Sequence, residues 1–391
     1  MKKINITIFA TLIIAFFSCN SINKDSEYFS GKIYSVNEDN LKIINNITSK
    51  VLPIEDYNFG LIAAYDSLII YWNPKLQTHF FKMFNVDTGK ELGLFCNRGK
   101  GHNETISVGP VMQLFKKGVD ISTLIYAYNE GKIFMWNIDK SIKDKRTIYD
   151  TVVDFNYKNK DKLSRYNRIF YKNNDILFAR IASVPLNSEE STTLYYQKYN
   201  MCTNNVLQDY HIYKKSVRNG KASVEPSSFY YSSDFLKPDG SKIVMAMRYL
   251  PQINIIDTNT GDVVGFRMPE GPGFSLFETK MKPYNIYYNS VQADDNYIYA
   301  AYWGKKQWEV SRNAKVPILN TIHVFDWQGN LLYKIKTDRS YFRIWLDQGR
   351  NRLYTTDIEN SEVSYIDLSP LLKVRTPKHA DSASLLMHLF N

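Results

Sequence analysis

Eight residues have side chains that could bind a ligand, and they lie in or beside the segments that join predicted strands. Arginines there can hold carboxylates through two parallel hydrogen bonds, and exposed tryptophans can stack on sugar rings or planar groups. The alternative is structural, because charged side chains also form solvated rims and tryptophans also pack between sheets. The candidate ligand-binding residues are Arg98, His102, Glu104, Arg165, Arg248, Trp303, Trp308 and Arg339.

The known catalytic patterns are missing from the sequence. Its six histidines form no HExxH or HxH pair, which gives a zinc site little support. No GxSxG segment marks a nucleophilic serine. We therefore predict no catalytic residue and no metal ligand from local motifs, and we expect binding rather than catalysis.

The charge balance is basic, with 49 Lys and Arg against 39 Asp and Glu, a formal net charge of +10. This balance favours acidic partners or anionic surfaces. The basic residues are spread thinly along the chain, whereas a nucleic-acid-binding domain clusters them on one face. We expect no nucleic-acid partner.

The first residues have the pattern of an export signal. Lys2 and Lys3 precede a short apolar run over residues 6–17, and Ser18 and Cys19 follow it. As a helix the run would be far shorter than the roughly 30 Å hydrocarbon core of a membrane. It therefore predicts a secretory signal that is removed. The alternatives for Cys19 are an incidental cysteine after an ordinary signal peptide and a modified cysteine.

The rest of the chain is rich in residues that favour strands. Aromatic residues make up 15% of the sequence, and turn-forming clusters separate the strand-like runs. Six times, a run ends in a polar residue whose side chain can accept backbone N–H groups of the following turn. These residues are Asp87, Asp139, Asn200, Asp257, Asp326 and Asp367. A four-stranded unit repeated six times predicts an all-β, six-bladed β-propeller, with these aspartates in structural roles.

The ends of the chain are expected to meet in one blade. The sixth repeat lacks an outermost strand, and two unassigned strand-like segments, Lys32–Val36 and Leu41–Ile44, lie near the N-terminus. We expect one of them to be the N-terminal strand that closes the last blade, leaving no free sheet edge. The predicted boundaries are a signal peptide at 1–18, a flexible tether at 19–29, a propeller at 30–372 and a C-terminal tail at 373–391.

Three features resemble known families. Ser18-Cys19 resembles the lipobox of bacterial lipoproteins, which implies lipidation of Cys19 and an anchor in the membrane. Residues 234–245 (DFLKPDGSKIVM) resemble the repeat of TolB propellers. Gly99, Gly101 and Glu104 match the joint after the first blade in TolB-like six-bladed propeller lipoproteins of Bacteroidetes, although His102 replaces the proline of that joint.

This resemblance implies an outer-membrane lipoprotein of the cell envelope, facing either the periplasm or the outside. Its function would be to bind or scaffold an envelope partner protein or a small ligand, acidic or glycan. A second hypothesis is a calcium-dependent lactonase- or lyase-like enzyme, because related propellers hold calcium in the central channel through single residues of separate blades. An acidic and amide lining of the channel would favour the enzyme, and an aromatic and basic lining would favour binding.

Two cysteines besides Cys19 test the order of the blades. Cys96 is expected at the end of the first blade and Cys202 in a turn of the third. Because a disulfide needs Cα atoms within about 7 Å, cysteines on blades that are not neighbours cannot pair. We predict two free thiols.

Overall fold

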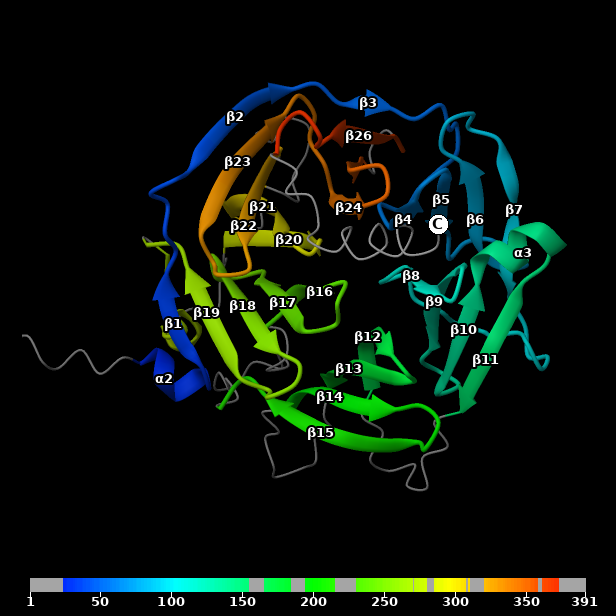
Figure 1. Ribbon diagram of the computed structural model, residues 1–391, viewed down its shortest axis with the longest axis horizontal. Helices are drawn as coiled ribbons and strands as arrows, with labels where there is room; N and C mark the ends of the chain where they lie inside the picture. The colour runs from blue at the N-terminus through cyan, green and yellow to red at the C-terminus, as the bar shows by residue number, and fades with distance from the viewer. Residues whose placement is uncertain are drawn as a thin grey trace, which may run out of the picture.

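Six sheets, four of them with four strands and two with five, are arranged radially around a central axis in the computed structural model (Figure 1). The structure describes residues 24–154, 165–183, 194–214, 230–269, 271–279, 285–306, 309, 320–357 and 361–372. Each sheet is one blade, and its strands run in chain order from the axis outwards, except for the strands that the N-terminal segment adds at the outer edges of three blades. The predicted all-β, six-bladed propeller is thereby confirmed.

The first three blades follow one another along the chain. Blade 1 contains β4 (Ile62–Tyr65), β5 (Leu68–Trp72), β6 (His79–Asn85) and β7 (Glu91–Asn97). Blade 2 contains β8 (Phe115–Lys117), β9 (Asp120–Ala127), β10 (Lys132–Asn137) and β11 (Ile148–Asp154), with helix α3 (Ile138–Asp144) after β10. Blade 3 contains β12 (Arg165–Asn173), β13 (Ile176–Ser183), β14 (Leu194–Asn200) and β15 (Asn205–His211).

The last three blades each take a strand from the N-terminal segment, which is a fifth strand in blades 4 and 5 and the fourth strand in blade 6. Blade 4 contains β16 (Ser232–Leu236), β17 (Lys242–Met247), β18 (Gln252–Asp257), β19 (Val263–Arg267) and β1 (Lys32–Ser35), and α4 (Leu276–Thr279) follows it. Blade 5 contains β20 (Asn285–Ala293), β21 (Tyr297–Lys306), β22 (Thr321–Asp326), β23 (Leu331–Thr337) and β2 (Lys42–Ile47). Blade 6 contains β24 (Arg343–Asp347), β25 (Arg352–Thr356), β26 (Val363–Asp367) and β3 (Lys50–Val51).

The middle strands read as continuous apolar runs because neighbouring blades cover both of their faces. In β17 every residue after Lys242 is buried, and β18 is buried from Gln252 to Ile256. Large apolar clusters lie between adjacent blades, such as the one that joins blades 4 and 5 through Val244, Ile253 and Val291. The core is therefore divided among the blade interfaces.

The turn after the repeated strand is held by a side chain in all six blades, but the residue differs from the prediction in two. Asp257 Oδ1 accepts the N–H groups of Asn259 and Thr260, and Asp326, Asp367 and Asn200 act in the same way. In blade 1 the acceptor is Asn85, and in blade 2 it is Asn137 at the start of α3.

The strands predicted to end at Asp87 and Asp139 therefore end two residues earlier. Asp87 instead accepts hydrogen bonds from Arg350 at 2.6 and 2.8 Å, which links blade 1 to blade 6. Asp139 accepts the N–H of Ile121 at 2.8 Å. Both aspartates are structural, as expected, but Asp87 links the turns of two blades and Asp139 links α3 to β9, so neither holds the turn itself.

The N-terminal segment closes the ring through a different strand from either one predicted. β3 pairs with β26 in blade 6, and Leu52 N–H donates to Val363 O at 2.8 Å. The proposed closing segments form β1 and β2, which add in parallel to the outer edges of blades 4 and 5. Residues 24–52, which we call the N-terminal strap, thus pass around three blades before the first blade begins (Figure 1).

The predicted flexible tether ends earlier than residue 29. Helix α2 (Asp25–Tyr28) opens the strap, and Tyr28 and Phe29 are each only 1% exposed. Asp25 Oδ2 lies 2.5 Å from Arg267 Nη1, and the Phe29 ring centroid lies 5.8 Å from that of Phe274. Residues 25–29 therefore belong to the folded propeller. The polar residues of this stretch suggested a tether, but its two aromatic residues, Tyr28 and Phe29, are buried.

The two thiols are free, as predicted. Cys96 lies buried in β7 of blade 1, and Cys202 lies exposed in the turn after β14 of blade 3. Cys19 and the predicted signal peptide lie outside the described residues, as does the C-terminal tail.

Candidate functional site

Two of the sequence candidates stabilise the joint after blade 1. The guanidinium carbon of Arg98 lies 3.9 Å from the Phe80 ring centroid, and its nitrogens donate to the carbonyls of Pro74 and Leu76 at 2.8 and 3.2 Å. Glu104 accepts the N–H of Gly101 at 2.9 Å, and a Cβ on Gly99 would lie 1.9 Å from the Glu104 carboxylate. The glycines therefore leave room for Glu104, and both Arg98 and Glu104 are occupied by structural contacts.

The other candidates outside the channel do not come together. His102 is exposed in the same joint, and Arg339 pairs with Glu362 at the surface between blades 5 and 6. Trp303 is 6% exposed and packs near Phe342, so it offers no stacking surface to solvent. The side chain of Arg165 and the whole of Trp308 lie outside the described residues.

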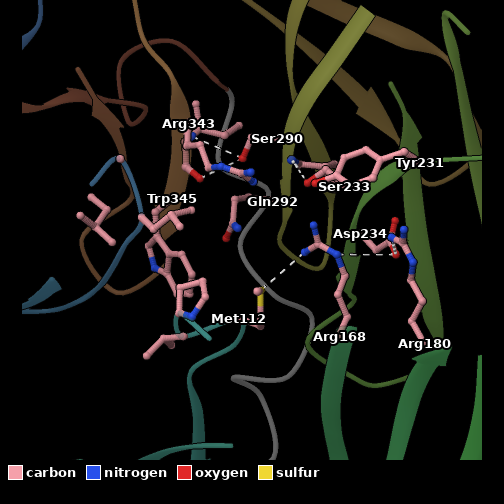
Figure 2. A pocket seen from close by; sticks show the side chains of 17 residues that line it. Met112, Arg168, Arg180, Tyr231, Ser233, Asp234, Ser290, Gln292, Arg343 and Trp345 are labelled. Carbon is pink, nitrogen blue, oxygen red and sulfur yellow. Dashed lines mark hydrogen bonds and ion pairs between the residues drawn. The ribbon is translucent and has the colours of Figure 1, made fainter. Parts of the chain in front are cut away.

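A cavity of about 280 Å³ lies where the innermost strands begin, and all six blades contribute to it (Figure 2). This is the face of the propeller that receives the joints between blades, and Arg98, His102 and Glu104 were predicted as candidates in one of these joints. The lining residues are Gly60, Leu61, Ile62, Pro110, Val111, Met112, Arg168, Arg180, Tyr231, Ser233, Asp234, Ser290, Val291, Gln292, Arg343, Ile344 and Trp345.

Hydroxyl groups fix the backbones around this cavity. The Ser233 hydroxyl of β16 accepts the N–H of Val291 in β20 at 3.1 Å. The Ser290 hydroxyl of β20 contacts Ile344 in β24, donating to its carbonyl at 3.3 Å. These bonds tie the innermost strands of blades 4, 5 and 6 to one another, so the side chains between them are held in place.

Three arginines from three strands line the cavity, and one carboxylate pairs with two of them. Asp234 Oδ2 lies 2.6 Å from Arg180 Nη1 and 3.9 Å from Arg168 Nε. Asp234 also accepts hydrogen bonds from the hydroxyls of Tyr196 and Ser232, both at 2.5 Å. Its charge is thus shared by three hydrogen-bond donors and the more distant Arg168. The third arginine, Arg343, forms no ion pair with any carboxylate in the described part of the chain.

Arg248, a sequence candidate, completes the basic cluster from β17 and its following turn. Its Nη1 donates to Asn289 Oδ1 at 3.0 Å, and its guanidinium carbon lies 5.6 Å from the Tyr231 ring centroid. The guanidinium of Arg180 lies 5.7 Å from the same ring. Tyr231 therefore sits among arginines at the entrance to β16.

The electrostatics of the cluster appear in the pKa values of its members. Burial by itself raises the pKa of the Tyr231 phenol, but three guanidinium groups outweigh burial and hold that pKa below its ordinary value. They belong to Arg168, Arg343 and Arg180. Burial also lowers the pKa of Arg343, and its arginine neighbours lower it further. An arginine nevertheless stays protonated at neutral pH, so the cavity carries a positive potential.

The donor set does not fit calcium. Calcium prefers six to eight oxygen ligands with several carboxylates, whereas this cavity presents three arginines and one carboxylate that is already hydrogen-bonded. Among the described residues, no three His, Cys, Asp or Glu side chains are grouped to hold a metal ion. The lining is basic and aromatic, which by the criterion above favours binding.

Sequence reasoning found Arg248 but missed Arg168, Arg180, Tyr231 and Arg343. They lie up to about 175 positions apart and meet only because blades 3, 4 and 6 converge on the axis. One signal was present: Arg180 interrupts the apolar run ILFARI of β13, and Arg343 opens RIWLD of β24. A charged residue in a strand that is covered on both faces is unusual and points to a partner or a ligand.

The family model described as TolB-like 6-blade propeller-like matches residues 56–348. The chain belongs to this family. The turn of residues 237–241 has the geometry that the family repeat requires, because Asp239 accepts the Ser241 N–H at 2.8 Å and Gly240 has a φ of +70°.

Two solved structures from Bacteroides share the fold of this TolB-like propeller. A Bacteroides fragilis protein described as exported is 11% identical, with a TM-score of 0.50, over 83% of this chain and 98% of its own. A member of the DUF4221 family from Bacteroides vulgatus is 11% identical, with a TM-score of 0.52, over 82% of this chain and 95% of its own. No curated protein matches the sequence. Within the described residues, no helix has the length and apolar character needed to cross a membrane.

Proposed function

We propose that this TolB-like propeller is an exported, lipid-anchored protein of the cell envelope that binds a small anionic ligand in its central channel. The observation that carries the proposal is the cavity where Arg168 and Arg343 face Tyr231, with one carboxylate to balance the surrounding arginines. A bound oxyanion would supply the missing negative charge and accept charge-assisted hydrogen bonds from the guanidinium groups.

Export is supported by the N-terminal segment and by the fold relative described as exported. The lipid anchor rests on Ser18-Cys19, and we expect Cys19→Ala to abolish lipid labelling and to release the protein from the membrane fraction or leave it uncleaved. Lipid labelling that persists in this variant would contradict the anchor while leaving the ligand site unaffected.

Thermal unfolding of the mature chain in the presence of small anions tests the ligand site. The probes are phosphate, sulfate, citrate and acetate at matched ionic strength, since salt alone also changes stability. A ligand at 100 times its Kd stabilises the folded state by about 2.7 kcal/mol. We expect at least one probe to raise the melting temperature in a saturable way, with titration calorimetry giving one site per chain.

Two matched arginine variants locate the binding. Arg343→Gln removes a cavity charge, and a charge-assisted hydrogen bond contributes about 1.5–3 kcal/mol, so affinity should fall roughly tenfold to a hundredfold. Arg339→Gln removes an arginine from the surface, where it pairs with Glu362, and should leave affinity unchanged. Equal losses in both variants, or no saturable effect of any anion on the wild type, would contradict the proposed site.

A further inference from the structure

The cavity has two chemically different sides. Arg168, Tyr231 and Asp234 lie on one side, and Trp345 lies on the other, with Arg343 two residues before it in the same strand (Figure 2). Ile62 and Val111 belong to the same apolar cluster as Trp345, and the remaining apolar lining residues include Leu61, Pro110 and Ile344. A ligand that fills the cavity must therefore meet cations with one end and hydrocarbon with the other.

Trp345, the largest side chain on the apolar side, has no free hydrogen-bond donor for a ligand. The indole N–H of Trp345 donates to the carbonyl of Ala64 at 2.9 Å, and this bond fixes the ring and uses its only donor. What remains for a ligand is the hydrocarbon of the indole. Val111, from the segment before β8, is also buried beside it. Water on this surface is released when an apolar group covers it.

The size of the cavity favours a ligand larger than an inorganic anion. An apolar protein cavity of about 150 Å³ holds a benzene molecule, and this cavity measures about 280 Å³. It therefore has room for one ring and an acid group. A free phosphate or acetate would engage the arginines and leave the apolar side uncovered.

We infer that the ligand is an amphipathic acid, in which a carboxylate or phosphate group carries an apolar body about the size of one ring. The acid group lies between Arg168 and Arg343, and the apolar body lies against Trp345 and Val111. This inference rests on the proposed anion site and narrows its ligand class.

Paired probes test the inference by titration calorimetry on the mature chain. Phenyl phosphate is compared with inorganic phosphate, benzoate with acetate, and benzyl alcohol tests a ring without a charge. In each pair, the probe with the ring should bind roughly tenfold to a hundredfold more tightly, because the cavity buries its apolar surface. Benzyl alcohol should not bind measurably. The stronger of the two pairs tells whether the acid is a phosphate or a carboxylate.

Two valine variants from the same segment give the matched control. Val111→Asn places an amide on the apolar side of the cavity and should reduce the affinity ratio of each pair severalfold. Val108 is buried to a similar extent, at 4% against 6%, but is not part of the lining, so Val108→Asn should leave the ratio unchanged.

Equal affinities within both pairs for the wild type would overturn the inference and leave the anion site standing. Binding of benzyl alcohol as tight as that of benzoate would also overturn it. If none of the probes binds, both the inference and the proposed function fail. The wild-type ratios decide these outcomes even if a valine variant does not fold.

Discussion

Replacing Phe29 by alanine tests whether the N-terminal strap belongs to the folded propeller. Phe29 is 1% exposed, and its ring centroid lies 5.8 Å from that of Phe274 and 6.0 Å from that of Tyr213. Truncating a fully buried phenylalanine loses its burial and leaves a cavity, which together cost about 3–5 kcal/mol. With an unfolding entropy of about 2.1 cal/mol/K per residue over roughly 340 residues, the melting temperature should fall by about 4–7 °C.

Tyr34→Ala is the matched control, because Tyr34 is an aromatic residue of the same strap but 51% exposed in β1. Its removal should change the melting temperature by about a degree or less. Differential scanning calorimetry of the mature protein, with the two variants side by side, measures both effects. If Phe29→Ala melts with the wild type, residues 25–29 are a tether after all, and the packing described for α2 is wrong.

Three further outcomes are expected. The pKa of Tyr231 lies below its ordinary value, so its phenolate forms as the pH rises through that pKa, and the affinity for anions should fall over the same pH range. Calorimetry across pH 7–11 should show this loss of affinity for the wild type and not for Tyr231→Phe. Thiol reagents should modify exposed Cys202 in the folded protein and buried Cys96 only after unfolding, as followed by mass spectrometry. Asp326→Ala removes an acceptor of two backbone N–H groups and should lower the free energy of unfolding by about 1 kcal/mol in urea titrations, whereas Asp87→Ala removes an exposed ion pair with Arg350 and should change it little.

The number of blades could be predicted because each repeat carries its own local chemistry. Asp257, Asp326 and Asp367 accept backbone groups two residues ahead, which is an interaction within one turn and therefore leaves a mark in the sequence. In blades 1 and 2, Asn85 and Asn137 do the same, two positions before the aspartate that the pattern favoured. Asparagine and aspartate are both favoured in such turns. The presence of the turn could therefore be predicted, but not which of the two residues holds it.

The path of the N-terminal strap could not be predicted, because its strands have no burial pattern of their own. β1 and β2 are mostly exposed, and β3 has only two residues. What holds them is hydrogen bonding to edges that exist only in the assembled blades, together with single contacts such as Lys334 with Glu38 at 2.9 Å. Position 31 also requires glycine, because a Cβ there would lie only 1.9 Å from the Val263 carbonyl oxygen.

The candidate site is built from residues of the innermost strands, whereas most of the residues predicted from the sequence lie in loops. The loop residues Arg98 and Glu104 form hydrogen bonds that stabilise the joint after blade 1, so their charged groups already have structural partners. Arg343 lies in an innermost strand, and removing it from water is costly unless another group compensates. Asp234 already compensates Arg180. A fold that retains a further arginine at such a position gains from it when a ligand supplies the missing charge, and this is why the channel rather than the rim is the place to look for the ligand proposed for this propeller.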